Sequence, residues 1–156
     1  MQKPIDLTLT QEGYNKLQKE FDDLMEARPG VLTRMVAARE MGDLSENAGY
    51  HAAKERLGYI DRRTRHLKLM LRFAEVKEAK GTDEVTFGSI VRVNNGDTEV
   101  EFAIVSAMEA DPMKLKISDV SPIGKVLLGK KTGDEAIIET PDGKMVYKVL
   151  EIKRSR

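Results

Sequence analysis

Arg39-Glu40-Met41-Gly42-Asp43-Leu44-Ser45-Glu46-Asn47-Ala48 contains one glycine and, directly after it, a pair of carboxylates three residues apart, Asp43 and Glu46. On each side of this stretch, apolar residues recur at steps of three and four, the spacing that keeps one face of a helix against a partner. Before the stretch, with one polar member, they are Tyr14, Leu17, Phe21, Leu24, Arg28, Val31, Met35 and Ala38. After it, again with one polar member, they are Tyr50, Ala53, Leu57, Ile60, Thr64, Leu67, Leu71 and Ala74. Two matching stripes joined by a short turn predict an antiparallel helical hairpin with this turn at its tip.

The hairpin is expected to be long for so small a chain. Arms of about 28 residues, at about 1.5 Å per residue, give a rod roughly 40 Å long with the two carboxylates at its end. Pro29-Gly30 falls inside the first arm, where proline removes a backbone hydrogen bond. The apolar register continues in phase beyond it, so we expect a kink near Arg28 and not a stop. Thr10 is the expected N-cap of this arm.

The second arm is predicted to begin near Asp43 or Ser45 and to fade around residues 79–81, where the apolar periodicity gives way to Gly-Thr-Asp. This change in pattern places the domain boundary between residues 1–79 and 80–156. Beyond it the chain is expected to form short strands around an Asn-Asn-Gly-Asp turn and one short helix. The expected strands are residues 85–93, 98–106, 114–118, 135–139 and 145–152, and the helix is residues 121–129. The fold class is therefore α+β: a coiled-coil hairpin followed by a small antiparallel sheet domain with one short helix.

The composition limits the function classes. The chain has 156 residues, 33% charged residues and a formal net charge of zero, which argues against a generic polyanion binder. Aromatic residues make up only 5% and tryptophan is absent, so stacking platforms for single-stranded nucleic acid are not expected. The absence of cysteine removes disulfides and cysteine-based zinc sites. No signal peptide or membrane helix is recognisable, and we expect a cytoplasmic monomer.

The pair Asp43 and Glu46 has two interpretations. In the first, which the motif alone favours, Asp43 caps the second helix and Glu46 reaches back to a free backbone N–H, as in a capping box. In the second, the two carboxylates offer oxygen ligands to a hard cation such as Mg²⁺. Two carboxylates on an exposed tip hold such an ion weakly, so a working site needs further ligands from another molecule.

The second arm is basic. Residues 54–72 carry seven Lys and Arg against two acidic residues. This surface fits either an ordinary solvated helix face or a face that attracts nucleic-acid phosphates. His51 and His66 lack a matching ligand set, so a metal role for either is not expected. No grouping of serine, histidine and acid suggests a self-contained catalytic site.

Residues 38–55, Ala-Arg-Glu-Met-Gly-Asp-Leu-Ser-Glu-Asn-Ala-Gly-Tyr-His-Ala-Ala-Lys-Glu, strongly resemble the signature of the bacterial Gre transcript cleavage factors, GreA and GreB. A second matching block is Ser-Pro-Ile-Gly-Lys-Val-Leu-Leu-Gly-Lys-Lys at residues 121–131, followed by Gly-Asp at 133–134 and Thr-Pro-Asp-Gly at 140–143. The likeness covers nearly the whole chain in the right order. Residues 56–65 look more like GreB, whereas residues 51–54 and 127–131 look more like GreA, and we favour the GreA branch.

The resemblance implies a coiled-coil hairpin and a C-terminal domain of FKBP-like fold. In this family the C-terminal domain docks at the rim of the secondary channel of bacterial RNA polymerase and the hairpin enters the channel. The tip carboxylates then help the polymerase hold its second catalytic Mg²⁺, so that backtracked RNA is cut and transcription resumes. The protein itself is then no enzyme. It supplies ligands to the active site of another enzyme.

By match to the motif, the resemblance implies that Asp43 and Glu46 are the acidic residues that share the Mg²⁺ ion. Arg39 and Lys54 occupy positions like those of the family's basic patch, which contacts the 3′ segment of the nascent RNA. Ser121 and Pro122 align with the surface that contacts polymerase. One departure is Gly49, which stands where relatives often have an acidic residue, and a glycine in a helix interior costs roughly 0.5–1 kcal/mol relative to alanine.

Two other functions are compatible with parts of the sequence. A Gre-like protein could enter the same channel and inhibit, but the Gly-Asp-Leu-Ser-Glu-Asn form of the tip argues against the altered, more acidic tip of inhibitory relatives. A coiled-coil adaptor with a prolyl isomerase module is disfavoured because the C-terminal half has too few aromatic residues for the pocket of such enzymes. They are Phe87, Phe102 and Tyr147.

Overall fold

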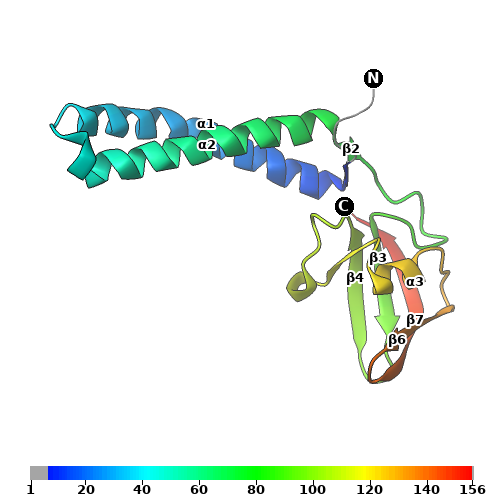
Figure 1. The fold of residues 1–156 in the computed structure, drawn as a ribbon. Helices are drawn as coiled ribbons and strands as arrows, with labels where there is room; N and C mark the ends of the chain where they lie inside the picture. The colour runs from blue at the N-terminus through cyan, green and yellow to red at the C-terminus, as the bar shows by residue number, and fades with distance from the viewer. Residues whose placement is uncertain (1–6, 156) are drawn as a thin grey trace. The chain divides into compact units, whose positions relative to one another are not determined.

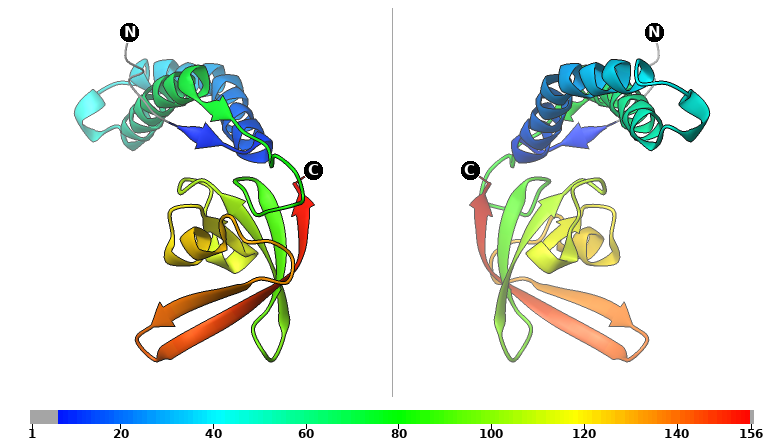
Figure 2. Two further views of the ribbon diagram at one scale, coloured as in Figure 1. Left: turned by 90° about the vertical axis from the view of Figure 1, so that its right-hand side faces the viewer. Right: turned by 90° about the vertical axis from the view of Figure 1, so that its left-hand side faces the viewer.

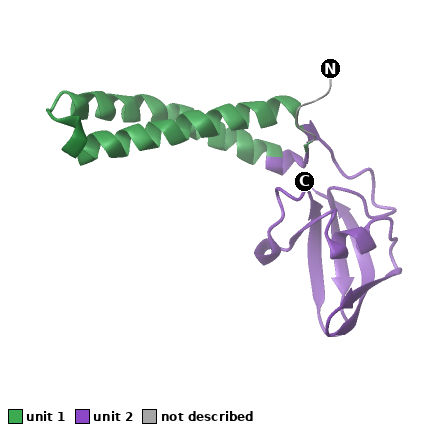
Figure 3. Cartoon of the chain, in the orientation of Figure 1, with its two compact units in different colours: residues 1–7, 14–74 green, residues 8–13, 75–156 purple. Residues whose placement is uncertain are grey.

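The computed structural model describes residues 7–155, which form two compact units (Figure 3). The first unit includes residues 14–74, and the second consists of residues 8–13 and 75–155 within the described range. The first unit is a helical hairpin, made by α1 (Gln11–Arg39) and α2 (Ala48–Phe73) with the short 3₁₀ turn η1 (Leu44–Glu46) between them (Figure 1). The first turn of α1 clusters with the second unit. Within residues 7–155, none of the helices combines the length and the apolar character of a membrane-spanning segment.

The two helices pack through the predicted stripe. The buried apolar residues of this seam are Leu24, Val31, Ile60, Leu67 and Met70, with Leu17, Phe21 and Leu57 partly buried against them. At about 1.5 Å per residue, helices of 29 and 26 residues are each about 40 Å long. The predicted helical hairpin is therefore confirmed, as is the α+β class.

Helix α2 differs from the prediction in its start, in its end and in one buried residue near its end. The second helix begins at Ala48, later than Asp43 or Ser45, and it ends at Phe73, before residues 79–81. Near this end Met70 is buried at 2% exposure, whereas Leu71, which the stripe predicted, is only half-buried.

Pro29 lies inside α1 without ending it, as predicted. Proline has no N–H, so one backbone hydrogen bond of the helix is missing at this position. The helix continues beyond it in the same register, since Val31 is buried in the seam at 2% exposure. The hydroxyl of Thr33 donates a hydrogen bond to the Pro29 carbonyl at 2.9 Å.

Two ion pairs tie the helices together beside the seam. Arg28 donates from Nε and Nη2 to the two carboxylate oxygens of Asp61, at 2.7 and 3.3 Å. Arg63 makes the same two-pronged contact with Glu20, at 2.5 and 2.9 Å. Hydrogen bonds from these guanidinium groups hold the pKa values of Asp61 and Glu20 below their ordinary range. All four side chains are about one third exposed, so the pairs contribute more to alignment than to stability.

The second unit is built on a five-stranded sheet with the order β5-β4-β3-β7-β6. The strands are β3 (Ser89–Asn94), β4 (Glu99–Val105), β5 (Lys116–Ser118), β6 (Glu135–Thr140) and β7 (Gly143–Arg154). All neighbouring strands are antiparallel except β4 and β5, which are parallel, so the sheet is mixed. The prediction of a purely antiparallel sheet is wrong at this pair. The register between β3 and β7 shifts at Arg92/Val93. Such irregularities increase twist, and the β6–β7 hairpin curls away from β3 and β4 (Figure 2).

The core of this unit lies on one face of the curled sheet. The one short helix, α3 (Pro122–Leu127), lies against β5 and β6 and buries Leu127 completely. Across the sheet, fully or nearly fully buried residues alternate along each strand, among them Val91, Val93, Ile104, Ala136 and Val149. This arrangement of a curled sheet with one short helix is the expected FKBP-like domain.

The start of α1 belongs to the second unit and is held by a side chain of that same unit. Thr10 is the N-cap, as predicted, because its Oγ1 accepts a hydrogen bond from the Gly13 amide at 3.1 Å. The carboxylate of Glu109 in turn accepts hydrogen bonds from the Thr10 amide and hydroxyl and from the Ser106 hydroxyl. A side chain at Gly13 would collide with this carboxylate, since its Cβ would lie 2.1 Å from Oε1. Just before the cap, β1 (Thr8–Leu9) pairs in parallel with β2 (Glu75–Val76).

The seam predicts where substitutions destabilise the hairpin. Ile60→Ala removes a side chain that is 0% exposed, and we expect it to lower the free energy of unfolding by about 2–4 kcal/mol. Leu69→Ala is the matched control, because Leu69 lies on the same helix at 39% exposure and should change the stability by less than about 1 kcal/mol. Urea unfolding followed by helical circular dichroism measures both, and equal losses would contradict the predicted seam.

Candidate functional site

The turn at the hairpin tip has a defined backbone shape. Helix α1 ends at Arg39, and Gly42 follows with a φ of +133°, a conformation that side-chain-bearing residues rarely adopt. The next residues, Leu44–Glu46, form the 3₁₀ turn η1. Asp43 caps this turn, since its Oδ1 accepts hydrogen bonds from the Ser45 amide at 3.0 Å and from the Ser45 hydroxyl at 2.9 Å.

Asn47 holds the tip to both helices. Its Oδ1 accepts a hydrogen bond from the Tyr50 amide at 2.9 Å, which makes it the N-cap of α2. Its Nδ2 donates to the carbonyl of Ala38, in the last turn of α1, at 2.6 Å. One amide side chain thus closes the turn from both ends. The sequence prediction missed this role, although an asparagine directly before a helix is a recognised capping signal.

The capping-box interpretation of Asp43 and Glu46 is wrong. Asp43 caps the 3₁₀ turn and not α2, and Glu46 makes no hydrogen bond to the Asp43 backbone among the described residues. The real cap of α2, Asn47, relieves Glu46 of that task. Both carboxylates are exposed, so they are available to another molecule.

The hydrogen bonds around Asp43 favour its charged form. The backbone amide of Ser45, and then the Ser45 hydroxyl, hold the pKa of Asp43 below its ordinary value. Both bonds use Oδ1. Within residues 7–155, Oδ2 has no hydrogen-bond partner, so an ionised carboxylate presents one free oxygen at the tip.

The tip by itself is a poor metal site. Among the described residues, no group of three or more acidic, histidine or cysteine side chains is placed to hold a metal ion. The two carboxylates fit the oxygen chemistry of Mg²⁺, which commonly takes one or two protein carboxylates and fills its remaining positions with water or phosphate. An ion at this tip therefore needs ligands from a second molecule.

The other residues singled out from the sequence flank the tip. Arg39 lies in the last turn of α1 and is exposed. Lys54 lies on the second turn of α2, with its ammonium group 6.0 Å from the centre of the Tyr50 ring. His51 packs edge-on against the same ring and is exposed. Gly49 is in the first turn of α2, not in the helix interior, and an added Cβ would make only ordinary contacts with Asn47 and Ala38.

Ser121 and Pro122 lie far along the chain, in the second unit. Ser121 is the N-cap of α3: its Oγ accepts from the Gly124 amide at 3.0 Å and donates to the Ser118 carbonyl at 2.6 Å. Pro122 fills the first position of the helix, where its lack of an N–H costs nothing. The close approach requires glycine at 124, because a Cβ there would lie 2.0 Å from the Ser118 carbonyl oxygen.

These two residues border a groove of about 480 Å³ between α3, β5 and the β6–β7 hairpin. Its lining is mostly apolar and includes Ile117, Ile123 and Met145. Met145 is 41% exposed, so part of this apolar surface faces solvent. The sequence prediction identified Ser121 and Pro122 but not the groove, because its walls come from segments that are distant in the sequence.

Comparisons with known proteins agree with this arrangement of hairpin and sheet domain. A family model described as "Transcription elongation factor, N-terminal" matches residues 7–76, and one described as "Transcription elongation factor, GreA/GreB, C-term" matches residues 79–154. The chain belongs to the GreA/GreB family of transcription elongation factors. The family that the sequence resembled is thereby confirmed.

Individual relatives belong to the GreA branch, as the sequence favoured. The chain is 45% identical to "Transcription elongation factor GreA" of Caldanaerobacter subterraneus, over 99% of this chain and 100% of the relative. It is 43% identical to the protein of the same name from Nitratiruptor sp., over 92% of this chain and 91% of the relative. Among solved structures, the GreA factor homolog 1 (Gfh1) of Thermus thermophilus is 29% identical, covering 96% of this chain and 99% of that chain, with a TM-score of 0.44.

The hydrogen bonds at the tip predict how Asp43 titrates. Its stabilising contacts are complete above the ordinary aspartate pKa and are lost as the pH falls through the lowered value. Ser45→Ala removes the hydroxyl donor and leaves the amide, so we expect the pKa of Asp43 to rise part of the way back to its ordinary value. Carbon-detected NMR titration of the side-chain carboxyl measures this. An unchanged Asp43 pKa in the variant would contradict the observed contact.

Proposed function

We propose that this member of the GreA/GreB family stimulates RNA polymerase to cleave backtracked RNA, by placing the hairpin tip in the secondary channel. The observation that carries the proposal is the exposed pair Asp43 and Glu46 on a turn that its own hydrogen bonds hold in place. Neither carboxylate is consumed by capping α2. Because the turn is fixed and the carboxylates are free, they are suited to complete a site in another protein.

In this proposal Asp43 and Glu46 share a Mg²⁺ ion with the polymerase. When bound, such an ion stabilises the attacking and leaving oxygens of a phosphodiester bond. The Ser45 contacts favour the ionised form of Asp43 and use only one of its two oxygens. The protein alone holds no ion tightly, because two exposed carboxylates leave most of the coordination sphere to others. We infer that it is not an enzyme by itself.

Arg39 and Lys54 are proposed to contact the 3′ segment of the nascent RNA. Both are exposed cations near the tip loop: Arg39 is the last residue of α1, and Lys54 lies on the second turn of α2. A phosphate chain passing the tip would meet positive charge on either side of the carboxylates. These contacts would hold the RNA in register while the carboxylates act on the ion.

The groove beside Ser121 and Pro122 is proposed to dock the second unit on the polymerase rim. Its apolar lining and its size suit an apolar side chain of a partner, with Ser121 and Lys116 as polar neighbours. In this proposal the second unit provides the affinity for polymerase, and the tip of the first unit provides the carboxylates for cleavage. The protein is proposed to act as a monomer, since one tip serves one active site.

The carboxylates are tested by charge-neutral substitutions that keep their shape. Asp43→Asn or Glu46→Gln should lower the rate of transcript cleavage in a stalled complex on the order of 10–100-fold, because each removes an ion ligand. Higher Mg²⁺ should restore part of the loss. Glu40→Gln removes the same charge from an exposed tip residue and should leave cleavage nearly unchanged.

Unchanged cleavage in both carboxylate variants, with binding to polymerase intact, would sink the proposed mechanism. The same assay distinguishes the inhibitory alternative. A channel-binding inhibitor would slow the recovery of stalled complexes, whereas the proposed function requires that the wild-type protein speeds it.

The groove is tested by a charge placed on its lining. Met145→Glu should weaken binding to polymerase about tenfold or more, because a carboxylate would be desolvated when a partner covers the groove. Ile137→Glu is the matched control, since Ile137 is 52% exposed on the neighbouring strand and does not line the groove. Equal affinities of the two variants in a fluorescence anisotropy titration would contradict docking at this groove.

A further inference from the structure

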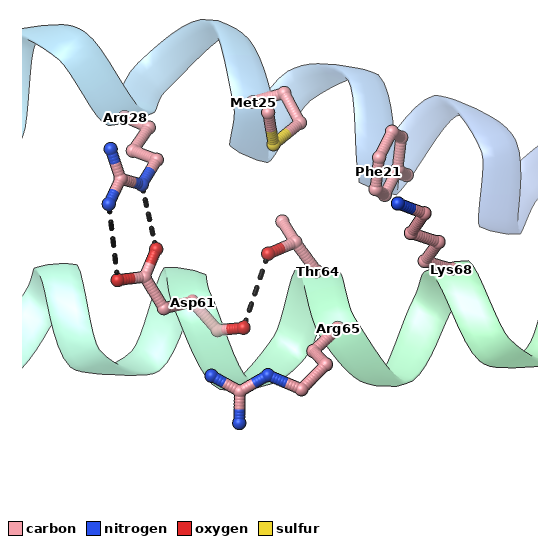
Figure 4. Close-up of a pocket in the computed structure, with 7 residues that line it drawn as sticks. All are labelled: Phe21, Met25, Arg28, Asp61, Thr64, Arg65 and Lys68. Carbon is pink, nitrogen blue, oxygen red and sulfur yellow. Dashed lines mark hydrogen bonds and ion pairs between the residues drawn. The ribbon is translucent and has the colours of Figure 1, made fainter.

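A hollow of about 400 Å³ opens between α1 and α2 in the middle part of the hairpin (Figure 4). Its apolar floor is formed by Phe21 and Met25 from α1 and by Thr64 from α2. Phe21 is half-buried, and Met25 is 45% exposed. An aromatic ring and a thioether thus face an open space that neither helix fills.

The hollow exists because Thr64 stands in the apolar stripe where its neighbours are Ile60 and Leu67. Threonine is shorter than either, and its hydroxyl donates to the Ile60 carbonyl at 2.7 Å instead of reaching toward α1. Figure 4 shows its methyl carbon directed toward Met25 across the gap. A leucine at this position would fill the gap and strengthen the seam, so packing alone does not explain the threonine.

The rim of the hollow is positively charged. Arg28, Arg65 and Lys68 line it together with a single carboxylate, Asp61, and Figure 4 shows the Lys68 ammonium directed toward Phe21. Asp61 is already occupied by its two-pronged contact with Arg28. Arg65 and Lys68 have no hydrogen-bond or ion-pair partner within residues 7–155, and the net charge of the rim is +2. Two unpaired cations beside an apolar floor favour a ligand that combines a flat apolar ring with an anionic group.

We propose that this hollow binds a nucleotide. The base would lie against the Phe21 ring and the Met25 thioether, contacts that suit any planar heteroaromatic ring. The phosphates would lie near Arg65 and Lys68, two long, flexible cations whose positions on α2 are three residues apart. The volume lies within the range of small-molecule sites and fits one base with its sugar, not a long polymer. The site uses none of the tip or groove residues, so it is independent of the proposed function.

The test uses the full-length protein and ATP or GTP as the probe, in buffer without magnesium so that the tip carboxylates recruit no metal-bound nucleotide. The ε-methyl groups of the eight methionines are labelled with carbon-13. Titration should shift the Met25 signal in a saturable manner. The Met113 signal is the internal reference, because Met113 is 93% exposed in the other unit and should stay in place.

Paired variants assign the binding to the hollow. Arg65→Ala with Lys68→Ala should weaken nucleotide binding about tenfold or more, as expected for lost charge-assisted hydrogen bonds. Arg62→Ala with Arg72→Ala removes the same charge from α2 outside the hollow and should change the affinity less than about twofold. Thr64→Leu should abolish the Met25 shift while it raises the midpoint of thermal unfolding.

Several outcomes would overturn the proposal. One is the absence of saturable binding of ATP and GTP at millimolar concentration. A second is equally tight binding of inorganic tripolyphosphate, which has the charge without the ring. A third is an equal loss of affinity in both double variants. The fourth is that a short single-stranded RNA, and neither nucleotide, binds with the expected sensitivity to Arg65 and Lys68, which would make the surface a nucleic-acid contact instead.

Discussion

The contact between α1 and α2 is the constraint on which the rest of the first unit depends. The buried apolar residues of the two helices gather in one shared seam, so each helix depends on its partner for stability. The buried seam from Leu24 and Val31 to Ile60 and Leu67 supplies the driving force. The ion pairs at Glu20–Arg63 and Arg28–Asp61 add direction, because they pair particular turns of one helix with particular turns of the other. The position of the tip follows from this alignment.

At the tip, neighbouring residues hold the turn in place, so Asp43 and Glu46 are not needed to cap α2. A helix that begins at a sharp turn needs a cap, and an acidic residue nearby is often used for this purpose. Here Asn47 takes that role and also binds the end of α1, while Gly42 provides the backbone conformation that lets the chain reverse. The carboxylates therefore carry charge without a structural duty toward α2. Their exposure is a consequence of what the neighbouring residues do.

Much of the fold could be predicted from the sequence, because its strongest signals are local. The three- and four-residue spacing predicted the hairpin, and Pro122 and Ser121 marked the start of α3. The start of α2 was predicted too early because the motif at residues 43–46 fits a capping box as well as a 3₁₀ turn, and only geometry separates the two. The strand predicted from residue 85 begins at Ser89, since Val85 instead exchanges hydrogen bonds with Gly129 and Lys130. Long-range partners of this kind leave no local signal, and neither do the groove and the hollow, whose walls come from separate segments.

The heptad packing of the helical hairpin also restricts how the length of the hairpin can change in evolution or by design. One inserted residue turns everything beyond it by about 100° and moves it by about 1.5 Å, which would rotate the carboxylates around the rod axis and misalign the two arms. Paired insertions of about seven residues, one set in each arm, restore both the facing stripe and the direction of the tip. Each such insertion lengthens the hairpin by about 10 Å, so homologues that keep the carboxylates aimed in this direction should differ in length by whole in-phase repeats and not by single residues.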